Sequence, residues 1–211
     1  MSEYNAYKKP YEGGYQKKER SEYVPKPPEP HHGLVYQAYA VVGNKEVPSK
    51  WLEWAEQTAI KLDELGFTLR TGGGAMPLEE AFENATTHKE IHLPWKEFNQ
   101  KESSYTRTHA GAAGLIRKLQ PNFESLKPAV QAILSRNAAV MYGKDLRSPV
   151  RFLITYTEDG VEHGKDRTSQ TGFAGLAIGL AGWLKIPVYN LKNEEAVSKL
   201  KIYVDHLAIQ G

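Results

Sequence analysis

The sequence predicts an α/β protein with a mostly parallel sheet and helices on both faces. Short runs rich in Val, Ile, Tyr and Phe alternate with longer segments whose apolar residues recur at helical spacing. Glycine-bearing turns follow several of these runs. The run at residues 150–156 is rich enough in Val, Phe, Leu and Ile to lie at the centre of a sheet. Repeated β-α-β units of this kind indicate a Rossmann-like fold with about five or more strands.

The first unit follows from local signals. Residues 35–42 read as a buried strand that ends at Gly43 and Asn44. Pro48 and Ser49 then begin a helix that Gly66 closes, and residues 67–69 form a second strand. The other expected elements, in chain order, are a helix at 77–86, a strand at 90–95, a mainly helical section at 99–142 interrupted by Pro121 and Pro128, the strand at 150–156, a small-residue helix at 172–182, a strand at 188–191, and a helix from Asn193 with a last segment at 201–206.

Length and composition bound the number of domains. With 211 residues, 40% of them hydrophobic and 25% charged, the chain can bury a sizeable core. We expect one domain over residues 34–211, preceded by a disordered or extended tail over residues 1–33, which has hardly any aliphatic residue to bury. The small-residue helix leaves two alternatives open, packing against the sheet or against another subunit of a homo-oligomer.

Charge and targeting signals narrow the partners. A net charge of +2 permits nucleic-acid binding without demanding it. The interleaved Tyr and Lys of the tail could stack on single-stranded DNA, but nearly balancing acids favour a solvated tail. No apolar run is long enough to span a membrane, and the first residues lack the apolar core of a secretory signal. We therefore expect a cytoplasmic protein without a membrane partner.

Candidate ligand-binding residues follow the strands, because ligands bind beyond the carboxyl ends of the strands in open parallel sheets. Glycine turns there expose N–H groups to a phosphate. The predicted ligand-binding residues are Gly43, Asn44, Thr71, Gly72, Gly73, Gly74, Trp95, Lys96, Arg136, Asn137, Thr171 and Gly172. Glu79 and Glu80 begin the helix after the triple glycine, where a carboxylate would hold ribose hydroxyls, promote glycosidic cleavage, or only favour the helix N-terminus.

Several chemistries have no support in the sequence. The chain has no cysteine, and its histidines show no metal-ligand spacing. There is no dinucleotide fingerprint after the first strand, no phosphate-loop Gly-Lys-Ser/Thr and no Gly-x-Ser-x-Gly elbow. We therefore expect no metal and no cofactor.

The motifs in this order resemble the SLOG superfamily, which unites DNA-processing protein A (Smf) proteins with the Lonely Guy phosphoribohydrolases. The closer likeness is to its small stand-alone, phage-type members, which would place the protein in the cytoplasm of a host. The resemblance covers about residues 35–191 and rests on Tyr39-Ala40-Val41-Val42-Gly43-Asn44, Arg70-Thr71-Gly72-Gly73-Gly74, Glu90-Ile91-His92-Leu93-Pro94-Trp95, Ser135-Arg136-Asn137 with Gly143, Thr171-Gly172 to Gly175, and Ile186-Pro187-Val188-Tyr189-Asn190-Leu191.

The family implies a Rossmann-like fold that holds nucleotides, nucleotide-derived signals or single-stranded DNA. Two departures bear on function: Glu79 fills the acidic position after the triple glycine with one glycine missing, and the Pro-Gly-Gly-x-Gly-Thr-x-x-Glu signature is absent. The sequence therefore favours binding of a nucleotide-derived small molecule. The alternatives are an N-glycosidic hydrolase of nucleoside monophosphates, with Glu79 or Glu80 at the reacting centre, and a single-stranded DNA-binding protein.

Overall fold

The computed structural model describes residues 37–210. The expected tail over residues 1–33 lies outside this part of the chain. Five parallel strands form one sheet in the order β3-β2-β1-β4-β5, which confirms the predicted Rossmann-like fold. The strands are β1 (Gln37–Val42), β2 (Phe67–Thr71), β3 (Lys89–Ile91), β4 (Leu153–Thr155) and β5 (Val188–Asn190).

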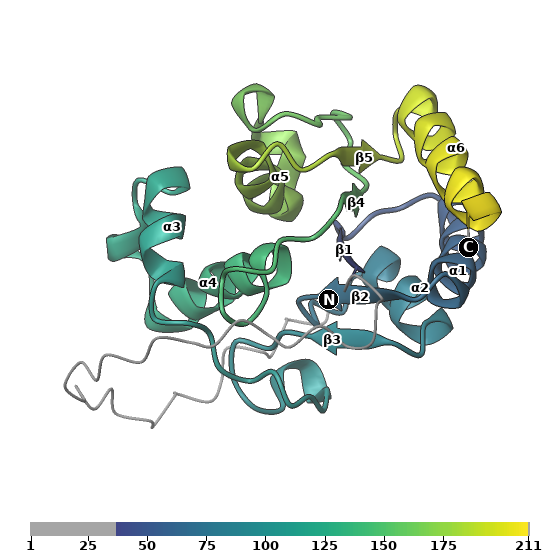
Figure 1. Cartoon of the computed structure of the whole chain (residues 1–211). Helices are drawn as coiled ribbons and strands as arrows, with labels where there is room; N and C mark the ends of the chain where they lie inside the picture. The colour runs from purple at the N-terminus through teal and green to yellow at the C-terminus, as the bar shows by residue number, and fades with distance from the viewer. Residues whose placement is uncertain (1–36, 211) are drawn as a thin grey trace. The chain divides into compact units, whose positions relative to one another are not determined.

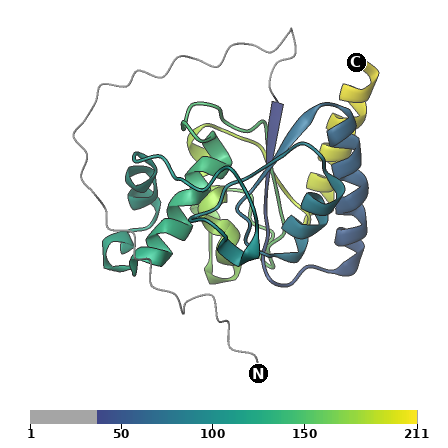
Figure 2. The same ribbon diagram turned by 90° about the horizontal axis from the view of Figure 1, so that it is seen from below.

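Helices cover both faces of this sheet (Figures 1 and 2). The α-helices are α1 (Ser49–Glu64), α2 (Pro77–Ala85), α3 (Ala112–Leu119), α4 (Pro128–Tyr142), α5 (Gly175–Trp183) and α6 (Glu194–Gln210). Short 3-10 turns are η2 (Phe98–Gln100), η3 (Phe123–Ser125), η4 (Gly164–Asp166) and η5 (Ser169–Ala174). Figure 2 shows α3, α4 and α5 on one side of the strands and α1, α2 and α6 on the other.

The alternation of β1 divides the core into two layers. Ala38, Ala40 and Val42 face the cluster that contains α3, α4 and α5. Tyr39 and Val41 face the cluster of α1, α2 and α6 instead. Because successive side chains of a strand point to opposite faces, a central strand in a doubly covered sheet must be apolar at every position. The two alanines of β1, Ala38 and Ala40, both lie on the α4 and α5 side.

Several element boundaries differ from the predictions. β2 continues to Thr71 rather than ending at 69, and α5 begins at Gly175 rather than at 172, because residues 169–174 form η5. β3 ends at Ile91 rather than at 95, because the Leu93 N–H donates to the Tyr105 carbonyl (2.8 Å) and draws the chain away from the sheet. β4 begins at Leu153 rather than at 150, since the Val150 N–H donates to Met141 at the end of α4. The expected separate segment at 201–206 is instead part of α6, which continues the helix from Glu194.

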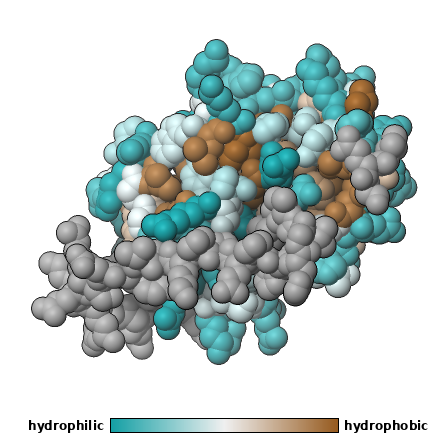
Figure 3. Space-filling model, in the orientation of Figure 1, coloured by the Kyte–Doolittle hydropathy of each residue, from teal (hydrophilic) through white to brown (hydrophobic). Residues whose placement is uncertain are grey.

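The surface of the described region is mixed. Figure 3 shows apolar residues gathered toward the middle of one face, with hydrophilic residues around them. The exposed large hydrophobic side chains are Ile60, Phe173, Trp183, Leu184 and Ile202. Within residues 37–210, no helix combines the length and apolarity needed to cross a membrane.

Candidate functional site

The sheet has a topological switch point between β1 and β4. The chain leaves β1 toward β2 on one side, and after β3 it crosses to β4 on the other side of β1. The loops that follow β1 and β4 therefore diverge at this point and leave a crevice position at the carboxyl edge. The Thr155 hydroxyl donates to the Val42 carbonyl (2.6 Å), which ties the two strand ends together. Gly43 and Asn44 stand directly beyond this bond.

Glu79 lies beneath the glycine turns and accepts hydrogen bonds from both. The Gly43 N–H donates to Oε1 (3.3 Å) and the Gly74 N–H donates to Oε2 (2.9 Å). The residue is only 2% exposed. The amides of the two turns thus converge on the protein's own carboxyl, whereas from the sequence we expected a ligand phosphate there.

Opposing effects act on the pKa of Glu79. Burial raises this pKa above its ordinary value, because the charged form loses its hydration. The positive charge of Arg136 and the two amide donors lower it, while the negative charge of Glu83 raises it further. The net shift is upward. Glu79 is therefore an internal group that ties the turn after β1 to the turn after β2.

The triple glycine is required by close packing. A Cβ atom at Gly72 would lie 2.6 Å from Cζ of Arg136, and one at Gly73 would lie 2.5 Å from Cδ2 of Leu93. Gly73 also has φ of +61°, in the left-handed region that favours glycine. The Arg136 guanidinium lies beside Gly72, and its Cζ is 5.3 Å from the ring centre of Phe98. The turn is thus a buried wall built against an arginine.

Thr71 is held inside the same wall. Its hydroxyl donates to Oε1 of Glu83 (2.5 Å), and Lys101 forms an ion pair with the other oxygen of that carboxylate. Both Thr71 and Glu83 are buried. Two buried glutamates, one turn apart on α2, therefore anchor the helix under the triple glycine.

Asn44 clamps the loop after β4 onto the loop after β1. Its side-chain amide donates to the Thr171 carbonyl (3.2 Å), and its Oδ1 accepts from the Phe173 N–H (3.1 Å). Gly172 lies between these contacts with φ of +60°, and a Cβ there would be 2.9 Å from Oδ1 of Asn44. The clamp spans the switch point and presents the Phe173 ring, which is 62% exposed, at the carboxyl edge.

Asp159 organises the loop on the far side of this clamp. The hydroxyls of Thr168 and Thr171 each donate to its Oδ2 (2.6 Å). Partial burial raises the pKa of Asp159, but these hydroxyl donors outweigh it and hold the pKa at about 2. The Thr171 hydroxyl also accepts from the Thr168 N–H (2.8 Å), which completes a capping box at the start of η5.

The structure distributes the other predicted residues between the surface and the interior. Glu80 and Lys96 are exposed, and Lys96 forms an ion pair with Glu97 (3.5 Å). Trp95 is half-buried and packs edge-on against Phe98, with ring centres 5.0 Å apart. Asn137 is buried, and its side-chain amide donates to two carbonyls of its own helix. Asn44, Thr171 and Gly172 are therefore the predicted residues that come together at the switch point, whereas Gly43, Arg136 and residues 71–74 surround Glu79.

Sequence reasoning missed Phe173 and Asp159. Phe173 followed a predicted binding glycine directly, but nothing in the sequence indicated that its ring would be exposed. For Asp159 a signal was available, since Thr168 and Thr171 have the three-residue spacing of a capping box within the polar loop. Among residues 37–210, no group of three or more His, Asp or Glu side chains is arranged to hold a metal ion.

Comparisons with known proteins do not extend this picture. No protein-family model matches the chain, and neither the curated proteins nor the solved structures include a match.

Proposed function

We propose that the protein binds a nucleotide or a nucleotide-derived small molecule at the carboxyl edge of the sheet, over the clamp of Asn44 with residues 171–173. The observation that carries this proposal is the exposed Phe173 ring at the topological switch point, held there by a main-chain hydrogen bond to Asn44. An exposed aromatic ring whose backbone is held in this position is a stacking surface for a nucleobase, whatever the identity of the base.

The surroundings of Phe173 suit the phosphate of the same ligand. α5 begins two residues later in the chain, at Gly175, and the positive end of its dipole is at this first residue. Lys45 follows Asn44 in the chain and is exposed. We propose that this helix N-terminus and Lys45, both close in sequence to the residues of the clamp, hold the charged group of the ligand.

We place the proposed ligand away from the triple glycine, because that turn is already packed against other groups of the protein. The Gly74 N–H is already used by Glu79, and Gly72 and Gly73 are packed against Arg136 and Leu93. Cleavage of a glycosidic bond by Glu79 gains no support, because both of its oxygens accept backbone hydrogen bonds in the interior. Membership of the SLOG superfamily is part of this proposal and rests on the sequence resemblance alone.

Calorimetry on the full chain tests the proposal. The titrants are nucleoside monophosphates, cyclic nucleotides, ADP-ribose and a short single-stranded DNA. Base–aromatic stacking is worth about 1–3 kcal/mol, so Phe173→Ala should weaken binding by about 5- to 150-fold. Ile202→Ala is the matched control, because this side chain is 69% exposed on α6, and it should leave affinity unchanged.

Two results would overturn the proposal. One is the absence of any heat of binding from the folded wild-type chain across the small-molecule panel. The other is binding that Phe173→Ala leaves unaltered, which would place the ligand elsewhere. Binding confined to the DNA oligonucleotide would instead favour the single-stranded DNA alternative.

A further inference from the structure

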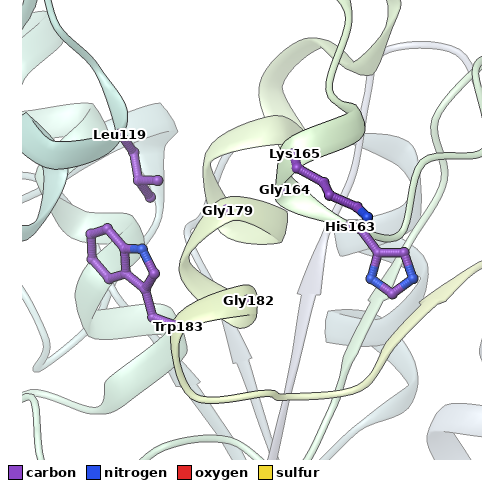
Figure 4. Close-up of a pocket in the computed structure, with 7 residues that line it drawn as sticks. All are labelled: Leu119, His163, Gly164, Lys165, Gly179, Gly182 and Trp183. Atoms are coloured by element: carbon purple, nitrogen blue, oxygen red, sulfur yellow. The ribbon is translucent and has the colours of Figure 1, made fainter.

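A surface hollow of about 460 Å³ lies beside α5, away from the switch point (Figure 4). Its lining residues are Leu119, His163, Gly164, Lys165, Gly179, Gly182 and Trp183. This volume is within the range of sites that hold small molecules, roughly 300–1,000 Å³. α5 has nine residues, about 13 Å at the helical rise, and Phe173 precedes its first residue whereas Gly182 and Trp183 are at its last turn. The hollow is therefore distinct from the site proposed above.

Glycine backbone forms the floor of the hollow. A Cβ at Gly164 would lie 2.9 Å from Cα of Gly179, so η4 and α5 touch backbone to backbone. A Cβ at Gly179 would lie 3.1 Å from the Leu119 side chain. Packing thus explains Gly164 and Gly179.

Gly182 has no such explanation. Its φ is not in the left-handed region, and a Cβ there would meet no atom within 4 Å. Glycine inside a helix costs about 1 kcal/mol relative to alanine. The absence of a side chain at Gly182 leaves open space, and Gly182 lines the hollow.

The two walls differ in chemistry. Figure 4 shows Leu119 and Trp183 together on one side of α5 and His163 and Lys165 on the other. The Trp183 indole is 41% exposed, and Nζ of Lys118 lies 5.9 Å from its ring centre. No carboxylate is among the lining residues. One wall therefore offers apolar and aromatic surface with the Lys118 ammonium beside it, and the other offers the hydrogen-bonding side chains of His163 and Lys165.

We propose that this hollow binds a small aryl anion, a planar ring that carries one carboxylate or phosphate group. The ring lies over the glycine floor against Trp183 and Leu119, where the absence of side chains allows close approach. The anionic group lies toward Lys165 and His163, which donate hydrogen bonds to it.

The test is a titration of the ¹⁵N-labelled full chain, followed by the indole N–H resonance of Trp183, which Trp183→Phe identifies. The probes are phenyl phosphate and benzoate, which share the ring and differ in the anionic group. Phenol and inorganic phosphate supply each half of the ligand alone. We expect a saturable shift with at least one aryl anion and at least tenfold weaker binding of either half.

Variants place the ligand. Gly182→Leu fills the open space and should lower affinity at least tenfold. Gly114→Leu is the matched control, because a Cβ at Gly114 on α3 also meets nothing within 4 Å, yet Gly114 does not line the hollow. Lys165→Ala should lower affinity for the anions and leave phenol unchanged. Phe173→Ala, at the other end of α5, should have no effect.

The proposal fails if no aryl anion shifts the Trp183 resonance at millimolar concentration. It also fails if Lys165→Ala, or a folded Gly182→Leu, binds the aryl anions like the wild type. Since the Lys165 side chain is exposed, that variant keeps the test decisive even if Gly182→Leu does not fold. Loss of binding in Phe173→Ala would show that the probes occupy the switch-point site instead.

Discussion

Replacing Glu79 by glutamine tests whether this side chain is the internal tie between the turns after β1 and β2. Glutamine has nearly the same shape, but only one of its two terminal atoms can accept a hydrogen bond. Either the Gly43 or the Gly74 N–H then loses its acceptor inside the protein. A buried donor left without a partner costs about 1–3 kcal/mol, so we expect the free energy of unfolding to fall by about that amount.

Urea denaturation followed by circular dichroism measures the fall in the free energy of unfolding. Thermal denaturation measures the matching fall in melting temperature. For a chain of this size each kcal/mol lowers the melting temperature by about 2–4 °C, so the expected fall is about 2–12 °C. Glu80→Gln is the matched control, since Glu80 is the next residue of the same helix and is exposed. Its effect should stay within about 0.5 kcal/mol. Equal stabilities of the two variants would refute the internal role of Glu79.

The pH dependence of the same pair gives an independent check. Burial, opposed by Arg136 and the two amide donors, raises the pKa of Glu79 in the folded chain above its ordinary value of 4.5. The folded state then binds more protons than the unfolded state, so the stability from Glu79 is full below about pH 4.5 and is lost as pH rises. The difference between wild type and Glu79→Gln should therefore be larger at pH 4 than at pH 8. A difference that grows with pH would contradict the upward shift.

Three further substitutions test the triple-glycine turn, helix α3 and the loop after β4. Gly72→Ala should destabilise the protein by about 1–3 kcal/mol in thermal melts, because its methyl group meets Arg136; no loss would mean that the guanidinium moves freely. Gly114→Ala should stabilise it by about 0.5–1 kcal/mol in the same melts, since the new methyl enters open space on a helix. For Asp159, whose pKa is held at about 2, Asp159→Asn should remove the part of acid destabilisation that develops as pH falls from about 4 to 2. An unchanged acid limb in pH-dependent melts would show that the Thr168 bond does not matter for stability.

The order of strands and helices could be predicted from local pattern because each element carried its own signal. β1 is apolar at every position after Gln37, and α1 begins after a proline and ends before a glycine with φ of +77°. The boundaries of β3 and β4 could not be predicted, since Leu93 and Val150 leave the sheet to bond partners 12 and 9 residues away in sequence. A continuous helix at α6 was misread because its central residues are also good strand formers.

For the candidate site, too, some features could be expected from the sequence and others could not. From the sequence we expected the glycine-turn amides to face the phosphate of a ligand, because such turns expose backbone N–H groups. The sequence could not indicate that Glu79 occupies that place, that Arg136 crosses Gly72, or that Phe173 stands exposed over Asn44. These facts depend on the relative placement of helices and loops, and residue type alone does not set it.

By itself the amino-acid sequence determined the fold class and the helical cover on both faces of the sheet, since periodicity and strand direction are local properties. Only the tertiary structure decided which groups face the carboxyl edge of the sheet. Groups distant in sequence, such as the Asn44 side chain and the Phe173 N–H, meet only after the sheet has formed and the chain has crossed from β3 to β4. The same crossing leaves an internal glutamate beneath the triple glycine and an aromatic ring at the switch point.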